Sequence, residues 1–198
     1  RRMANDSLTK VFLSASIPYP DRDRKFYDTA DIISIRDAVR ALATVVIPKA
    51  HLVWGGHPSI TPLIRFIVER MNVNLRNHVT LYQSLFFEEY FPSDNFLFEN
   101  IVLTERRGNR EESLKLMRNK LIGENDFKVG IFIGGMEGIN DEYLIFKEKH
   151  PSALILPIAS TGAAASFLYE SQPEIFDIRL KSDYAYMSLF RDLLDDLI

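Results

Sequence analysis

The sequence contains no cysteine. Disulfide bonds, thiolate metal sites and cysteine nucleophiles are therefore excluded, and the absence fits a protein of the reducing cytoplasm. No spacing of His, Asp and Glu residues suggests a metal site either. We therefore predict neither a bound metal nor a resident cofactor.

Long apolar runs are also missing. No run reaches the ~20 residues that a membrane-spanning helix needs, and the first residues, Arg1 to Asp6, hold no hydrophobic signal core. We therefore expect a cytoplasmic protein that is neither secreted nor membrane-bound. Basic residues are not in excess, because the formal net charge is −3 at pH 7. Proteins that coat nucleic acid usually present a basic face, so nucleic acid is not expected as a main partner.

Two familiar phosphate-binding motifs are absent. The sequence has no G-x-G-x-x-G dinucleotide fingerprint and no P-loop that ends in Gly-Lys-Ser or Gly-Lys-Thr. This excludes an ordinary dehydrogenase and a P-loop kinase at the level of the motif.

The chain has 198 residues, of which 46% are hydrophobic. That length and that apolar content predict one globular domain with a sizeable core. No linker, repeat or low-complexity stretch divides the chain. We expect a single domain over residues 1–198, with residues 1–9 flexible.

Short β-rich runs alternate with helical periodicities along the chain. Asp31 stands in front of one helical run as a predicted N-cap. The alternation predicts an α/β fold, a Rossmann-like three-layer α/β/α domain with a mostly parallel central sheet. The order of the strands stays open. Strands are predicted at 11–16, 52–54, 79–82, 101–104, 129–133 and 153–158. Helices are predicted at 32–46, 111–121, 141–149 and 184–198. Two more helices are predicted, one after Gly55–Gly56 that ends at about residue 71 and one that begins at residue 160.

Glycine pairs end two of the predicted strands, at Gly55–Gly56 and Gly134–Gly135, and Ser160-Thr161-Gly162 follows a third. Glycine at such a turn permits positive φ and lets backbone N–H groups approach a ligand. The helix that follows directs its positive end at the same place. Because ligands bind at the carboxyl ends of strands in open parallel sheets, we expect these turns to share one crevice. The candidate ligand-binding residues are Ser14, Ser16, Gly55, Gly56, His57, Gly134, Gly135, Met136, Glu137, Gly138, Glu142, Ser160, Thr161 and Gly162.

Most candidate residues allow two interpretations. Glu137 and Glu142 could accept hydrogen bonds from ribose hydroxyls, or could simply favour the positive end of a helix. His57 could donate to a phosphate or stack on a base, or could be an ordinary loop histidine. Ser160 and Thr161 could bind an anion or only cap a helix.

Two further segments also stay open. The charged run 21–25 is interpreted as a solvated loop, with a mobile lid as the alternative. The aromatic segment 86–98 is interpreted as a loop or short helix that packs rings onto the core. Its alternative is a partner surface or a wall of the ligand site, because grouped aromatic side chains are costly to expose.

The residues around these turns resemble the SLOG superfamily. The resemblance rests on Val11–Ser16, Gly55–Pro58, Gly134–Gly138 with Glu142-Tyr143, and Leu156–Ala163, and it extends from about Lys10 to Tyr169. It implies a Rossmann-like fold shared with LOG-type phosphoribohydrolases, DNA-processing proteins and ligand sensors. The sequence looks closest to sensor-type members associated with TIR and sirtuin-like proteins in bacterial antiviral defence. By that resemblance the ligand is an NAD-derived nucleotide, such as a cyclic ADP-ribose.

The sequence departs from the LOG enzymes, which carry Pro-Gly-Gly-x-Gly-Thr-x-x-Glu at the second glycine turn. Ile133 replaces the proline, and residues 136–139 replace x-Gly-Thr. The missing threonine removes a hydroxyl that would face a phosphate, and Glu137 adds a negative charge there. These departures argue against phosphoribohydrolase activity, although Glu142 remains available for the acidic position.

Three hypotheses about function follow. The first is a sensor that binds an NAD-derived nucleotide and signals through self-association or through a TIR or other effector protein. The second is an N-glycoside hydrolase of LOG type in which Glu142 is catalytic; no other catalytic residue is assigned. The third is an oligomerisation domain that uses the aromatic segment as its interface. The first is preferred, with a small-molecule nucleotide as ligand and a homo-oligomer expected.

Overall fold

The computed structural model describes residues 7–198. Six strands form one sheet in the order β4-β3-β2-β1-β5-β6, and every neighbouring pair is parallel. The expected parallel sheet is therefore confirmed. Part of the N-terminal segment expected to be flexible, residues 1–6, lies outside the described residues. The strands are β1 (Lys10–Ser16), β2 (His51–Gly55), β3 (Val79–Ser84), β4 (Ile101–Thr104), β5 (Phe127–Gly134) and β6 (Leu154–Ile158).

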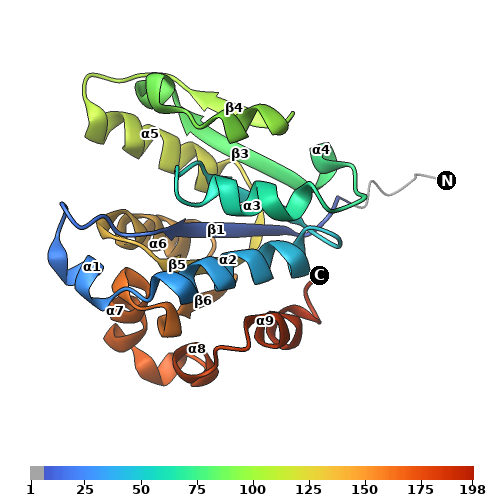
Figure 1. Cartoon of the computed structure of the whole chain (residues 1–198), viewed down its shortest axis with the longest axis vertical. Coiled ribbons are helices and arrows are strands. Elements are labelled where there is room, and N and C mark those ends of the chain that lie inside the picture. The colour runs from blue at the N-terminus through green and yellow to red at the C-terminus, as the bar shows by residue number, and fades with distance from the viewer. Residues whose placement is uncertain (1–6) are drawn as a thin grey trace.

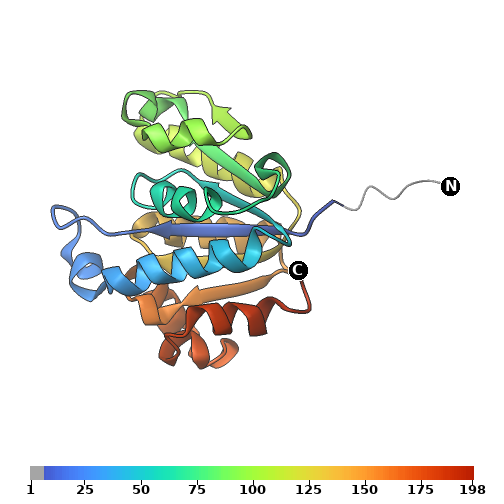
Figure 2. The ribbon, with the colours of Figure 1, turned by 45° about the vertical axis from the view of Figure 1, so that its right-hand side comes forward.

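Helices cover both faces of the sheet and complete the three layers (Figures 1 and 2). One face packs against α2, α3, α8 and α9 around a core that includes Leu13 and Trp54. The other packs against α1, α5, α6 and α7 around Phe12 and Phe132. The helices are α1 (Arg24–Thr29), α2 (Ile32–Val46), α3 (Thr61–Val68), α4 (Leu75–His78), α5 (Arg110–Gly123), α6 (Glu137–Lys149), α7 (Ala163–Ser171), α8 (Arg179–Ser182) and α9 (Tyr186–Leu194).

Helix α2 shows how directly the sequence specifies an element. Its bounds agree with the helix predicted at 32–46. The Asp31 side chain accepts a hydrogen bond from the Ser34 N–H at 2.9 Å, so the predicted N-cap is confirmed. The apolar positions face the sheet, where Ile35 and Val39 are fully buried. Capping and periodicity agree here, because both are local properties of the chain.

Several segments differ from the predictions. Helix α7 begins at Ala163 rather than at 160, and its N-cap is Gly162 with positive φ, so the predicted capping by Ser160 and Thr161 is wrong. Helix α9 is shorter than the helix predicted over 184–198.

Helix α6 begins at Glu137, ahead of the predicted residue 141, because Met136 is extended and the helix starts directly behind it. Gly138 weakens the helical signal in that first turn. The charged run 21–25 is only partly a loop, since α1 begins at Arg24 and the Asp23 side chain caps it by accepting from the Lys25 N–H.

The aromatic segment folds into two short 3-10 helices, η1 (Leu85–Tyr90) and η2 (Ser93–Leu97). The predicted packing of rings onto the core is confirmed for Phe98, whose ring meets that of Trp54 edge-on with centroids 5.2 Å apart. Phe96, in contrast, is 88% exposed. Within residues 7–198, no helix is both long enough and apolar enough to cross a membrane.

Candidate functional site

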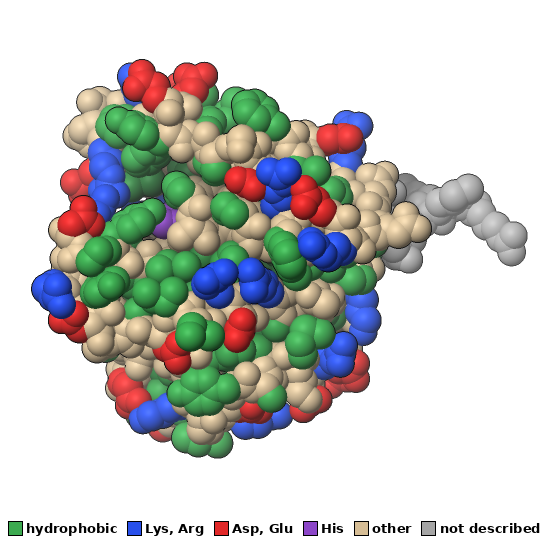
Figure 3. All heavy atoms as spheres, viewed as in Figure 1, with side chains coloured by type: hydrophobic (Ala, Val, Ile, Leu, Met, Phe, Trp, Pro, Cys, Tyr) green, Lys and Arg blue, Asp and Glu red, His purple; other side chains and the backbone are tan. Residues whose placement is uncertain are grey.

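The sheet reverses its direction of growth at β1. From β1 the chain adds β2, β3 and β4 on one side, and β5 and β6 then extend the sheet on the other side. Such a switch point leaves a crevice at the carboxyl ends of the two central strands. A cavity of about 500 Å³ opens there, which lies within the usual range for small-molecule sites. Figure 3 shows the hollow on the side where β1 ends, with basic and apolar side chains at its rim and histidine inside.

Nine of the fourteen candidate residues line the cavity. The other five lie at the end of β5 and in the turns after β5 and β6, and they do not line it. The residues that line the cavity are Ser14, Ser16, Gly55, Gly56, His57, Met136, Glu137, Gly138 and Glu142, whereas Gly134, Gly135, Ser160, Thr161 and Gly162 are not among its lining.

The Gly134–Gly135 turn fixes where α6 begins. Both residues have positive φ, +57° and +83°. A Cβ atom on Gly135 would lie 2.2 Å from Cγ1 of Ile139, and one on Gly134 would lie 2.5 Å from Cδ1 of Ile35. The Gly135 N–H donates to the Ser16 carbonyl at 2.8 Å. The two glycines thus let the turn after β5 pack closely against other segments of the same chain. This close packing brings Met136 and Glu137 to the cavity.

The hydroxyls after β6 are used inside the protein. Thr161 Oγ1 accepts from the Gly134 N–H at 2.9 Å and donates to the Ile158 carbonyl at 2.6 Å. Ser160 Oγ lies 2.9 Å from the Tyr186 hydroxyl. A Cβ atom on Gly162 would lie 2.0 Å from the Thr29 carbonyl oxygen. This turn supports the neighbouring turn after β5, because its hydrogen bonds hold the Gly134 backbone in place.

Glu142 lies at the floor of the cavity between two partners. The Ser14 hydroxyl donates to Glu142 Oε2, and Arg118 Nε lies 3.5 Å from Oε1. Arg118 also pairs with Asp141 at 3.0 Å. Burial raises the pKa of Glu142 above its usual value, although the charge of Arg118 and the hydrogen bond from Ser14 oppose the shift. A Cβ atom on Gly138 would lie 2.4 Å from Arg118 Nη2, so this glycine makes room for the guanidinium.

His57 is neutral at physiological pH. Burial, with a smaller effect from the charge of Arg22, lowers its pKa to about 4. Nδ1 accepts from the Ser59 N–H at 3.2 Å, which leaves the proton of the neutral ring on Nε2. The ring stacks on Tyr19 with centroids 5.8 Å apart. His57 can therefore act as an uncharged hydrogen-bond donor rather than as a cation.

The model of the SLOG cluster3 family matches residues 25–194. The chain belongs to the SLOG cluster3 family. The X-ray structure of TM1055, a structural-genomics target, is similar with a TM-score of 0.53 and 14% identity, over 82% of this chain and 81% of that chain. That likeness shows the fold alone, and no curated protein matches the sequence.

The SLOG domain also presents residues that sequence patterns did not identify as site residues. Arg22, Arg110 and Arg118 line the cavity, as do rings of the aromatic segment, among them Phe87 and Tyr90. Arg22 lies in the charged run 21–25, for which a mobile lid was the alternative interpretation. A wall of the ligand site was one of the alternatives for the aromatic segment. Arg110 and Arg118 carried no signal, because a charged helix face is usually solvated. Within the described residues, no group of His, Asp and Glu side chains is arranged to hold a metal ion.

Proposed function

We propose that this SLOG domain senses an NAD-derived nucleotide, such as a cyclic ADP-ribose. The observation that carries the proposal is the composition of the cavity wall at the switch point. Tyr19, Phe87 and Tyr90 supply aromatic surface, while Ser14 and Glu137 supply hydroxyl and carboxylate oxygens in the same space. A nucleotide needs both kinds of surface, because its base stacks on rings and its ribose hydroxyls donate hydrogen bonds.

The neutral His57 and the exposed carboxylate of Glu137 suit a sugar and a base better than they suit a bare anion. His57 offers an N–H without a charge, and Glu137 accepts hydrogen bonds at the first turn of α6. The cavity of about 500 Å³ is large enough for a base with its sugar and phosphates. Membership of the SLOG cluster3 family supports a nucleotide-related role.

The sensing output is proposed to be a change in association. The domain would bind its nucleotide without turnover and signal through a second copy of itself or through an effector such as a TIR protein. The setting we propose is bacterial antiviral defence in the cytoplasm, which follows from the resemblance to sensor-type SLOG proteins. Oligomerisation is part of this proposal, and sedimentation with and without ligand measures it.

One observation favours a second function, N-glycoside hydrolysis of LOG type. Burial raises the pKa of Glu142, and the Ser14 hydroxyl and Arg118 hold its carboxyl group in one orientation. A carboxyl with a raised pKa keeps its proton to a higher pH than a free carboxyl does, as a glycosidase acid does. The hydrolase hypothesis therefore assigns Glu142 the catalytic role.

Calorimetric titration with ADP-ribose, its cyclic isomers, NAD and AMP tests the proposal, with chromatography of each mixture afterwards. The expected result is saturable binding and an intact ligand. Release of a free base that is lost in Glu142→Gln would establish the hydrolase instead. No binding across the panel, together with self-association that ignores nucleotide, would overturn sensing in favour of an oligomerisation domain.

A further inference from the structure

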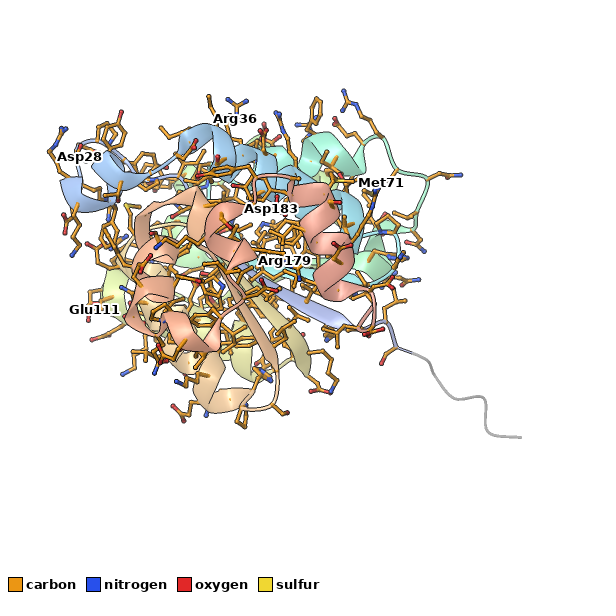
Figure 4. The ribbon with its side chains drawn as sticks, turned by 90° about the horizontal axis from the view of Figure 1, so that it is seen from below. Asp28, Arg36, Met71, Glu111, Arg179 and Asp183 are labelled. Atoms are coloured by element: carbon orange, nitrogen blue, oxygen red, sulfur yellow. The ribbon has the colours of Figure 1, made fainter. Side chains whose placement is uncertain are left out.

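Two arginines from separate segments line the same cavity. Arg22 belongs to the connection between β1 and α1, and Arg110 is the first residue of α5. Neither forms an ion pair within the part of the chain that the structure describes. Figure 4 shows Asp28, which lies on α1, and Glu111, the neighbour of Arg110, at one end of the domain and Met71 at the other. The two segments therefore lie at the same end of the domain, where the cavity opens.

The arginines act on one another and on the site. Burial lowers the pKa of Arg110, and the positive charges of Arg22 and Arg118 lower it further, while Glu137 acts in the opposite direction. Arg22 also contributes to the lowered pKa of His57. Arg22 is thus electrostatically coupled to both sides of the cavity. Positive charges held close together cost free energy, and an anion placed between them removes that cost.

The third arginine of the cavity is already paired. Arg118 contacts Asp141 at 3.0 Å and Glu142 at 3.5 Å. Its charge is therefore largely matched by carboxylates, whereas the charges of Arg22 and Arg110 are not. Within the described residues, the cavity thus holds two guanidinium groups that form no ion pair, those of Arg22 and Arg110, although Glu111 and Glu137 also line it.

We propose that Arg22 and Arg110 clamp a pyrophosphate linkage, so that the site selects nucleotides with two joined phosphates over nucleoside monophosphates. The nucleotide part of this inference rests on the proposed function. Each guanidinium can bind one phosphate through two parallel N–H donors. A diphosphate engages both arginines at once, while a monophosphate satisfies one and leaves the other without an anion. Glu137 then lies beside the neutral ribose next to the diphosphate. Its carboxylate accepts hydrogen bonds from the ribose hydroxyls and does not face the phosphate charges.

Phe87 extends the clamp toward a base. The Arg110 guanidinium lies 5.9 Å from the centroid of the Phe87 ring. A guanidinium over an aromatic face is held by that face and remains free to donate at its edge. Phe87 therefore orients Arg110 toward the cavity and offers a stacking surface beside it. Glu111 and Glu137 also line the cavity, and they exclude phosphate from the region around themselves.

The test compares ADP-ribose, AMP and inorganic pyrophosphate by calorimetric titration. The variants are Arg22→Gln and Arg110→Gln, with Arg24→Gln and Arg107→Gln as matched controls. The control arginines are sequence neighbours that pair with Asp28 and Glu105 outside the cavity lining. We expect wild type to bind ADP-ribose at least about tenfold more tightly than AMP. Each cavity variant is expected to lose about tenfold or more in ADP-ribose affinity, the effect of one charge-assisted hydrogen bond.

The outcomes separate the clamp from the proposed function. Equal affinity for AMP and ADP-ribose, or wild-type affinity in both cavity variants, overturns the clamp and leaves nucleotide sensing intact. If no nucleotide binds but pyrophosphate does, and only the cavity variants lose it, the clamp stands and the proposed function fails. If wild type binds neither nucleotides nor pyrophosphate, both fail. Melting temperatures of all four variants verify folding, which these exposed side chains are not expected to alter.

Discussion

The Ser14 hydroxyl, at the end of the first strand, donates a hydrogen bond to the carboxylate of Glu142 on α6. The two residues lie 128 positions apart in the sequence. They meet because β1 pairs with β5, with Ser16 opposite Gly134, and α6 begins directly after the turn that ends β5. The acidic group of the site is therefore oriented by a strand that precedes it by most of the chain.

Glu142→Gln is expected to change how stability depends on pH. The folded-state pKa of Glu142 is raised above 4.5 by burial, so the folded state binds this proton more strongly than the unfolded state. The contribution of Glu142 to stability is therefore largest at low pH and falls as pH rises from about 4.5 through the raised pKa. The free energy of unfolding, measured by urea titration at several pH values, should show this fall in wild type and lack it in Glu142→Gln. A wild-type advantage that grows with pH would contradict the prediction.

His57 is expected to affect the pH dependence of stability in the opposite direction to Glu142, and the variant His57→Gln tests this. The pKa of His57 falls from 6.5 to about 4 on folding, so the unfolded state binds the proton more strongly. Wild type therefore loses stability as pH falls from about 6.5 to about 4, by up to ~3 kcal/mol and less where solvent reaches the ring. His57→Gln should lack that part of the loss in the same urea experiment. Parallel pH curves for the two proteins would count against a neutral, partly buried His57.

Gly138→Ala is expected to separate stability from binding. A methyl group here would lie 2.4 Å from Arg118 Nη2 and displace the guanidinium from Glu142. The backbone is helical, so alanine itself is favourable by about 0.5–1 kcal/mol. The melting temperature should hold or rise while affinity for ADP-ribose falls. Gly123→Ala, where no atom lies within 4 Å of the added methyl, is the control and should bind as wild type does.

Gly135→Ala is expected to damage the fold rather than the ligand contacts. Its φ of +83° is unfavourable for alanine, and the methyl would overlap the Ile139 side chain. The left-handed backbone alone costs about 1–2 kcal/mol, and repacking of Ile139 adds to it. Chemical denaturation should show a clear loss of stability relative to wild type and to Gly123→Ala. Wild-type stability in Gly135→Ala would show that the turn after β5 can relax.

Phe87→Ala and Phe96→Ala divide the roles of the aromatic segment. Phe87 lines the cavity, whereas Phe96 is 88% exposed outside it. Loss of a stacking ring costs about 1–3 kcal/mol for a base, so Phe87→Ala should weaken ADP-ribose binding about tenfold, while Phe96→Ala should not change it. Sedimentation of both variants measures self-association. A loss of self-association confined to Phe96→Ala would make the exposed part of the segment a partner surface.

Several features were available from local sequence patterns. A short β-rich run predicted β1, a continuous apolar run predicted β5, and the helical spacing after Asp31 predicted α2 with its cap. The glycine turns marked the end of the sheet where the cavity lies. These signals are local, because a strand, a helix or a tight turn depends on side chains and backbone torsions within a few residues.

Only the tertiary structure decided which candidates face the cavity. Thr161 and Gly135 sit in turns that looked suitable for a ligand, yet their polar groups are used within the protein. Arg22, Arg110 and Arg118 reach the site because the crossovers around β1 and β5 bring their segments to one end of the sheet. Strand order and side-chain direction depend on how segments far apart in the sequence pack against one another. Such packing produces no local sequence pattern around the residues that it brings together, so it could not be predicted from the sequence.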